Sequence, residues 1–238
     1  MSGFWYGAAL QWKLDIRSRT LLITCYVVPL IFFALMGAIF TTVNPEMKYT
    51  LIQSMTIMGV SMGALIGLPP SLVEIYGSDI KKAYKANGVP LYLGMASTFL
   101  SAFIHLMIMS TIICIAAPIA FDASLPSNLP LYYVSLAIFT MVSLSVGCVL
   151  GLVVKNQAKL TMFSQLVFLP SIMLSGIMFP INLLPKAVET VGKLFPASWG
   201  FKIMVDNGFQ FENLWCLLLV FIAATILCFF MLKRHKSE

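Results

Sequence analysis

Charged side chains are scarce in this chain of 238 residues. Asp, Glu, Lys and Arg make up 10% of it, hydrophobic residues make up 60%, and the mean hydropathy is +0.93. A soluble domain is typically about 25% charged, and a soluble fold of this length could not bury so much apolar surface. The composition therefore excludes a water-soluble globular protein and indicates that lipid is the solvent.

The sequence also lacks the motifs of ATP-hydrolysing and proteolytic enzymes. It has no G-x-x-x-x-G-K-[ST] loop and no H-E-x-x-H motif, and the predicted spans hold no pair of aspartates. The five cysteines lie in apolar runs without C-x-x-C spacing, which is typical of small buried hydrophobic residues. We predict that the chain is not an enzyme and holds no catalytic group, cofactor or metal of its own.

Apolar stretches predict an all-α integral membrane protein with six transmembrane helices in one domain, 1–238, without a nucleotide-binding domain. A bilayer core needs about 20 apolar residues per helix, and the candidate spans are 21–42, 50–73, 91–118, 131–154, 160–179 and 214–232. Eleven of the fifteen Lys and Arg residues fall on one side, so both termini are predicted to be cytoplasmic. The net charge of +6 flanks the spans, which favours membrane lipids over nucleic acid as a partner.

The N-terminal segment 2–18 repeats apolar residues at helical spacing. Trp5 and Trp12 share one side, and Arg17 lies on the polar side with Gln11 and Asp15. This pattern is typical of an amphipathic helix in the cytoplasmic interface, with its Trp residues at headgroup level. The alternative is a frayed extension.

The cytoplasmic loop 74–90 predicts a second short helix. Ser78 is a plausible N-cap, and Asn87–Gly88 before Pro90 is a stop signal. A helix this short, held between two spans, usually needs a partner surface. A solvated turn is the alternative. The residues of this candidate contact surface are Glu74, Ser78, Ile80, Lys81, Ala83, Tyr84 and Lys85, with Tyr84 expected to be exposed.

The longest external segment, 179–213, predicts an amphipathic helix. Apolar residues from Leu184 to Phe195 recur at helical spacing opposite Lys186, Glu189 and Lys193. Such a helix should lie at the outer interface or dip partly into it, as a re-entrant segment. Its candidate residues are Phe179, Pro180, Leu184, Val188 and Trp199.

Small residues recur at intervals of four in two spans. Gly59, Gly63 and Gly67 line the second, and Ser143, Gly147 and Gly151 line the fourth. They predict a tight helix crossing, within one chain or at a dimer seam, unless they are simply glycines of the kind common in membrane helices. Pro69–Pro70 predicts a bend or hinge, or alternatively a plain helix end.

His105 is the one ionisable side chain well inside a predicted span. An intramembrane histidine is either a structural hydrogen-bonding group between helices or part of a transport path, as Ser97 and Ser101 nearby could also be. The lack of other buried charge disfavours an ion-coupled pump and a strongly charged cargo.

The segment MLSGIMFPINLLPKAVETVGKLFPASWG, 173–200, is the most specific part of the sequence. With its S-G-x-x-F-P-[IL] and P-x-x-[WY] elements, it resembles the membrane subunit of type 2 ABC exporters, the ABC-2 permeases. The loop before the third span also fits the family's usual sequence pattern at Glu74, Gly77, Val89 and Pro90, although Ala86–Gly88 departs from the residues most common there. With the amphipathic start and the six-span layout, the resemblance covers nearly the whole chain.

The resemblance implies a division of labour between chains. This chain would be half of a homo- or heterodimer in a bacterial cell membrane. Two copies of an ABC ATPase subunit would bind ATP and Mg, and the helix in 74–90 would be the coupling helix. The cargo would be an amphiphilic or apolar drug, antimicrobial peptide or lipid-like molecule that moves outward. The alternatives are a stand-alone channel or secondary carrier, and a non-transporting immunity or sensor protein.

Overall fold

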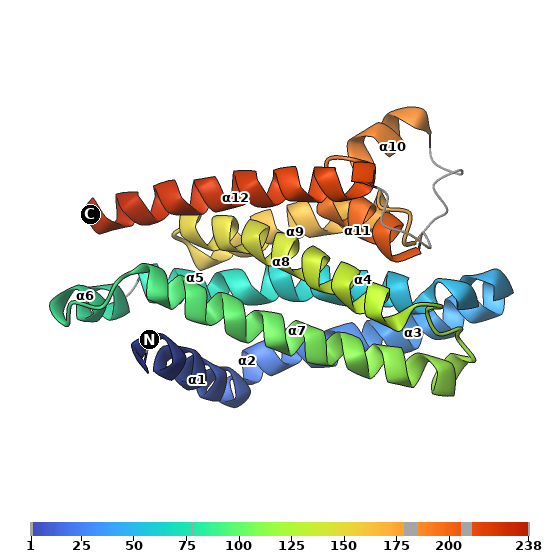
Figure 1. The fold of residues 1–238 in the computed structure, drawn as a ribbon, viewed down its shortest axis with the longest axis horizontal. Coiled ribbons are helices and arrows are strands. Elements are labelled where there is room, and N and C mark those ends of the chain that lie inside the picture. The colour runs from blue at the N-terminus through green and yellow to red at the C-terminus, as the bar shows by residue number, and fades with distance from the viewer. Residues whose placement is uncertain (1, 78, 179–184, 206–210, 238) are drawn as a thin grey trace.

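The fold, taken from a computed structural model, describes residues 2–77, 79–178, 185–205 and 211–237, and all regular structure in these ranges is helical. The helices lie side by side along one common direction (Figure 1). This confirms the predicted all-α class. In chain order the elements are α1 (Ser2–Arg17), α2 (Arg19–Leu22), the π-turn η1 (Ile23–Val27), α3 (Val28–Val43), the 3-10 turn η2 (Pro45–Tyr49), α4 (Leu51–Met62), the π-turn η3 (Gly63–Gly67), α5 (Leu68–Gly77), α6 (Asp79–Ala86), α7 (Tyr92–Phe121), α8 (Leu129–Val153), α9 (Gln157–Met173), α10 (Lys186–Gly192), α11 (Pro196–Val205) and α12 (Phe211–Ser237).

Within the described ranges, 5 helical segments are long and apolar enough to cross a membrane. They are Ile23–Val43, Leu51–Gly77, Tyr92–Phe121, Leu129–Val153 and Asn213–Arg234. They match the first four predicted spans and the last one, with ends shifted by a few residues. The chain is therefore a membrane protein with several candidate transmembrane helices.

The remaining predicted span, 160–179, corresponds to α9, and the prediction is wrong at its C-terminal end. α9 has 17 residues and ends at Met173, three residues after Pro170. At 1.5 Å per residue it is about 25 Å long, which is less than the roughly 30 Å of a bilayer core. In Figure 1, α9 runs from the end where α8 finishes to the end where α10 lies. A sixth crossing stays a prediction.

The second span, formed by α4, η3 and α5, lies at the centre of the bundle. In its central window 89% of the residues are buried, against 17% in the last span. Leu51 to Ser61 are all buried, the polar side chains among them included. α3, α7, α8, α9 and α11 all contact this span. The other helices therefore use it as a common core.

The π-turns in the first two spans are explained by the prolines that follow them. In η3 the N–H of Leu68 bonds to the carbonyl of Gly63, one residue further back than in an α-helix. Pro69 and Pro70 have no backbone N–H to donate, so the helix loses two backbone hydrogen bonds and its turn widens. The chain then continues as α5, so the plain helix end considered for Pro69–Pro70 is wrong.

The same arrangement occurs at η1 in the first span. The N–H of Val28 bonds to the carbonyl of Ile23, and Pro29 follows directly. The two π-turns contact each other: a Cβ built at Gly67 in η3 would lie 3.2 Å from the Sγ of Cys25 in η1. Two irregular turns therefore meet at one level of the bundle.

The glycine faces pack inside the chain. A Cβ at Gly63 would overlap the Leu106 side chain of α7, and one at Gly59 would lie 2.7 Å from Met109 Cε. On α8, a Cβ at Gly147 would overlap the backbone carbonyl of Ala64 in η3. Of the two crossings considered for these residues, the structure shows the one within a single chain.

The contact at Gly147 predicts a severe loss of stability on adding one methyl group. Gly147→Ala would push against backbone in η3, which cannot rotate away as a side chain can, so we expect it to cost about 1–3 kcal/mol or more. The matched control is Gly7→Ala in α1, where a Cβ meets nothing within 4 Å. That change should be neutral, or stabilising by up to about 1 kcal/mol through helix propensity.

Thermal unfolding of both variants in mild detergent measures the difference. Equal melting temperatures for Gly147→Ala and Gly7→Ala would show that the close approach of α8 to the second span is wrong.

Candidate functional site

The short helix α6 lies at the same end of the bundle as both chain termini (Figure 1). It ends as the sequence predicts. Gly88 adopts a left-handed φ of 64°, and the N–H of Val89 bonds back to the carbonyl of Tyr84 at 2.9 Å. This is the Schellman pattern, in which glycine at the turn satisfies the last carbonyls of a helix.

Tyr76 fastens α6 to the bundle, and sequence reasoning missed it. Its hydroxyl donates to the carbonyl of Leu91 at 2.6 Å and accepts the N–H of Met95 at 3.1 Å. The side chain is buried at the end of α5 and bridges to the start of α7. α5, the α6 turn and α7 are thereby joined at their base. A buried aromatic hydroxyl needs a partner, which is the signal that could have pointed to Tyr76.

Tyr84 points inward, which corrects the expectation that it is exposed. The residue is half-buried, and a Cβ at Gly94 of α7 would lie 3.2 Å from its ring atom Cε2. Among the described side chains of α6, Ile80, Lys82, Ala83 and Ala86 are exposed, and Ile80, which is 38% exposed, is the large apolar one among them. The surface that α6 offers to a partner therefore includes Ile80 and Ala83, together with Lys82 and Ala86.

The predicted contact surface also includes residues on either side of this exposed face. Glu74 is exposed near the end of α5, and Lys81 is half-buried on α6. Ser78 and the side chain of Lys85 lie outside the described residues, so the predicted N-cap stays a prediction.

The N-terminal helix α1 packs on α7 through a cluster of aromatic and polar side chains. Trp12 stacks on His105, with ring centroids 4.2 Å apart and the planes at 12°. The hydroxyl of Tyr26 in η1 lies 2.7 Å from His105 Nδ1. His105 is only 2% exposed, and its Nε2 has no hydrogen-bond partner. Of the two roles considered for His105, this packing favours the structural one.

Asp15 is buried in the same cluster, although its position on the polar side of α1 suggested exposure. It is 4% exposed, its Oδ2 accepts the Ser101 hydroxyl at 2.5 Å, and its Oδ1 accepts Gln11 Nε2 at 2.8 Å. Burial raises the pKa of the Asp15 carboxyl above its usual range, and these two hydrogen bonds oppose the rise only in part.

Helix α1 is thus an attached element of the bundle, and the frayed extension is wrong for its described part. Trp12 is held against α7 by its stacking on His105, and the prediction that the Trp residues sit at headgroup level stays a prediction. Arg17 is exposed, and Ser97 bonds within α7 to the carbonyl of Gly94 at 3.1 Å. The side chain of Trp5 lies outside the described residues.

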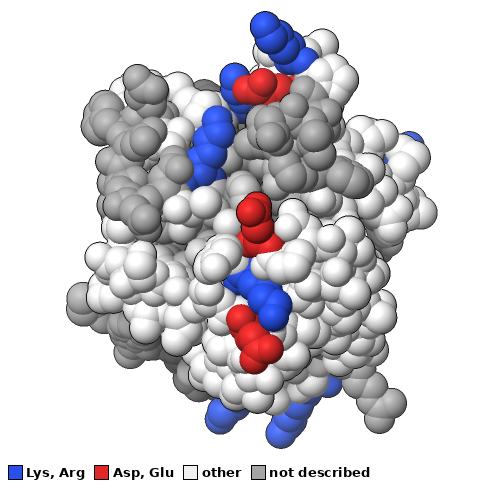
Figure 2. All heavy atoms as spheres, turned by 90° about the vertical axis from the view of Figure 1, so that its right-hand side faces the viewer, with Lys and Arg blue, Asp and Glu red and all other residues white. Residues whose placement is uncertain are grey.

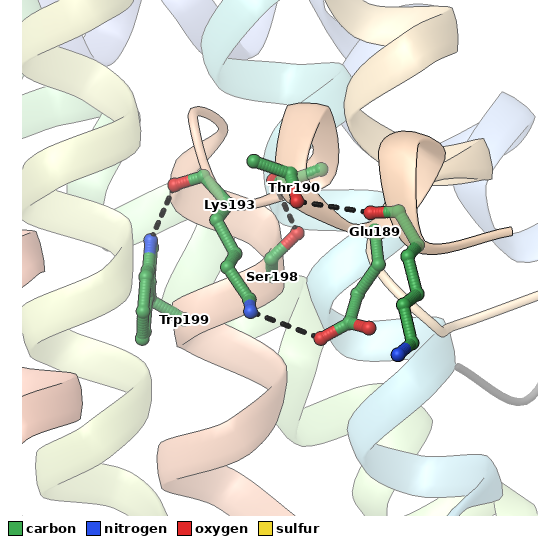
Figure 3. Close-up of polar contacts among 7 residues, drawn as sticks. Glu189, Thr190, Lys193, Ser198 and Trp199 are labelled. Atoms are coloured by element: carbon green, nitrogen blue, oxygen red, sulfur yellow. Dashed lines mark hydrogen bonds and ion pairs between the residues drawn. The ribbon is translucent and has the colours of Figure 1, made fainter. Parts of the chain in front are cut away.

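The opposite end of the molecule carries α10 and α11, joined by a tight turn (Figure 3). Trp199 Nε1 donates to the carbonyl of Lys193 at 2.7 Å, and the Ser198 hydroxyl donates to the carbonyl of Gly192 at 2.7 Å. Lys193 pairs with Glu189 at 3.0 Å, and this contact lowers the pKa of the Glu189 carboxyl. Trp199 therefore organises the turn that leads into α11.

The predicted amphipathic helix is shorter than expected, since α10 has 7 residues. Val188 is half-buried, whereas Val191 is 47% and Leu194 74% exposed, so the apolar side faces away from the bundle. This suits contact with the outer interface. Phe179, Pro180 and Leu184 lie outside the described residues.

Figure 2 shows this end face, where charged side chains of both signs follow one another down the middle of the face, between uncharged described residues. A pocket of about 300 Å³ opens between η2, the start of α8 and the end of α11. Its described lining residues carry no charge and include Tyr49, Gln53 and Asn128. Gln53 Oε1 is buried without a hydrogen-bond partner. Sequence reasoning missed this pocket, because its parts come from separate segments.

Within the described ranges, no group of three or more His, Cys, Asp and Glu side chains could hold a metal ion. The polar groups lie instead at helix junctions, where they fix one helix against another.

The bundle of long apolar helices defines a polytopic membrane protein. The profile of the ABC-2 type transporter family matches residues 3–209, so the chain belongs to that family. This confirms the resemblance found in the sequence. Membership indicates the permease component of an ABC transporter, a transport subunit that typically works with an ABC ATPase. A search of curated proteins finds no match.

The Asp15 cluster predicts a pH dependence that a neutral isostere removes. An acid whose pKa is raised by folding stabilises the folded state most at low pH, and this contribution is lost as the pH rises through the raised pKa. Asp15→Asn is therefore expected to flatten this part of the stability profile and to be at least as stable as wild type near neutral pH. Asp15→Ala leaves Gln11 and Ser101 without their hydrogen-bond acceptor and should lower the free energy of unfolding by roughly 1–3 kcal/mol.

Thermal unfolding in detergent, followed upward from about pH 4, where an ordinary Asp side chain begins to ionise, measures this loss. If Asp15→Asn loses as much thermal stability near neutral pH as Asp15→Ala does, then the negative charge itself holds α1 in place. That result would contradict this account.

Proposed function

We propose that the chain is the permease subunit of an ATP-driven exporter, and that a separate ABC ATPase drives it through α6. The observation that carries the proposal is the joint formed by Tyr76, Leu91 and Met95. It fastens α6 to both the second span and α7, while Ile80 and Ala83 remain exposed. A surface helix that is tied to the core can transmit a push, whereas a loosely tethered one would swing without moving the spans.

Transmission requires that the two states of the ATPase contact α6 differently. A force on Ala83 would pass along α5 to η3, where Pro69 and Pro70 have already removed ladder bonds. A π-turn that lacks these bonds bends more easily than a regular helix. We propose that the second span flexes at Gly63–Gly67 as the ATPase opens and closes.

The complex is proposed to contain two permease chains, identical or different, and two ATPase subunits that hold ATP and Mg. Both termini and α6 would face the cytoplasm of a bacterial cell, since the basic residues gather at that end. Two copies give the cargo a path between them, and each copy then receives its own ATPase.

An amphiphilic or apolar cargo, moved outward, suits the chemistry of the described surfaces. The external pocket near Gln53 offers amide and hydroxyl groups without charge. Neutral hydrogen-bonding groups beside apolar walls recognise partly polar molecules such as drugs, antimicrobial peptides or lipid-like compounds. Strongly charged cargo would meet no described counter-charge in this pocket.

A charge on the exposed face of α6 is predicted to release the ATPase. Ala83→Asp places an unpaired carboxylate in the proposed contact, and a buried unpaired charge at an interface costs about 2–5 kcal/mol. We expect at least about a tenfold loss of ATPase copurification when the chain is expressed with its ATPase. The matched control is Ala158→Asp at the start of α9, also exposed, which should leave copurification unchanged.

Cargo efflux and ATP hydrolysis, measured in vesicles, complete the test. Transport by the purified chain without any ATPase would instead support a channel or secondary carrier. Protection of cells that survives Ala83→Asp would support a non-transporting immunity protein.

A further inference from the structure

A groove of about 880 Å³ runs between the link from α6 to α7 and the end of α12. One wall is formed by Val89, Leu91 and Tyr92, and the other by Phe229, Leu232 and Lys233. Its surface is mostly apolar, and among the described residues Lys233 is the only charged one that lines it.

The groove lies at a membrane boundary. Tyr92 begins the third candidate span and Arg234 ends the last one, so both walls sit where a span meets the headgroup layer. Tyr92 is 59% and Phe229 67% exposed, and aromatic side chains at this depth are typical of membrane interfaces. The space between them therefore faces lipid.

We propose that this groove binds one anionic phospholipid, with an acyl chain along Leu91, Phe229 and Leu232 and the phosphate at Lys233. The occupant follows from the chemistry of the walls. An apolar trough that ends in a single ammonium group matches a molecule with a hydrocarbon tail and one negative headgroup. The described residues that line the groove include no carboxylate that would repel it, and basic pockets between spans on the cytoplasmic side bind such headgroups.

The bound lipid would support the base of α6. Val89 and Pro90 form part of the groove wall and follow directly after the turn that ends α6. A lipid packed there limits the movement of this link. The step from lipid binding to control of transport rests on the proposed function, whereas the binding itself does not.

Lipid retention on the purified full chain tests the site directly. The chain is exchanged into detergent with equal amounts of phosphatidylglycerol and phosphatidylcholine, and the lipids that remain bound are measured by native mass spectrometry. Wild type should retain one phosphatidylglycerol in preference. Lys233→Gln should lower this preference about fivefold, because each basic residue near the surface contributes about that factor.

Two further variants separate the groove from general surface charge. Lys159→Gln removes an exposed basic residue at the start of α9, outside the groove, and should retain the lipid as wild type does. Val89→Trp fills the groove at a position that is 36% exposed, so it should fold and lose the lipid.

The proposal would be overturned if Lys233→Gln and Lys159→Gln lost equal amounts of bound phosphatidylglycerol. It would also be overturned if Val89→Trp retained this lipid in full. Copurification of a second copy or of an ATPase subunit that photocrosslinks to Tyr92 in place of lipid would overturn it as well. None of these outcomes depends on transport, so the proposed function stands or fails separately.

Discussion

The burial of the second span is the constraint on which the rest of the structure depends. In lipid every backbone polar group must find a partner within the protein, and a span with two consecutive prolines cannot satisfy all of its own. Surrounding helices therefore enclose it, and α8 comes so close at Gly147 that only a hydrogen atom fits against the Ala64 carbonyl. Gly59 in α4 and Gly63 in η3 likewise let the Met109 and Leu106 side chains of α7 come close. A span that other helices enclose in this way can carry a displacement from one membrane face to the other.

Both α6 and α1 are tied to this core through α7. Tyr76 joins the end of α5 to the first turn of α7, and the cluster of Trp12, Asp15 and His105 joins α1 to the same helix further along. The α6 surface and α1 are thus not independent appendages. A partner that moved α6 would also strain the α7 contacts that hold α1, so this end of the bundle would respond as one connected unit.

Much of the fold could be predicted from local sequence signals. Long apolar runs predicted the five spans and Asn87–Gly88 predicted the end of α6, because each depends on neighbouring residues only. Pro69–Pro70 predicted either a bend or a helix end, and the π-turn before these prolines was not predicted. Contacts between distant segments could not be predicted in this way. Asp15 and Ser101 are separated by 86 positions, and the inward turn of Tyr84 depends on the absence of a side chain at Gly94. The end of α9 escaped prediction because an apolar sequence continues beyond Met173 while the helix does not.

The number of membrane crossings tests the account most directly, since only a crossing by α9 places α6, α1 and the C-terminus on one side. Single cysteines at Asn87, Lys159 and Leu194 can be probed in intact cells with a membrane-impermeant maleimide, because four of the five native cysteines are buried and the fifth is partly buried. We predict that Leu194→Cys reacts in intact cells, whereas Asn87→Cys and Lys159→Cys react only after permeabilisation. Reaction of Lys159→Cys and Leu194→Cys from the same side would contradict the account, because α9 would then not cross the membrane.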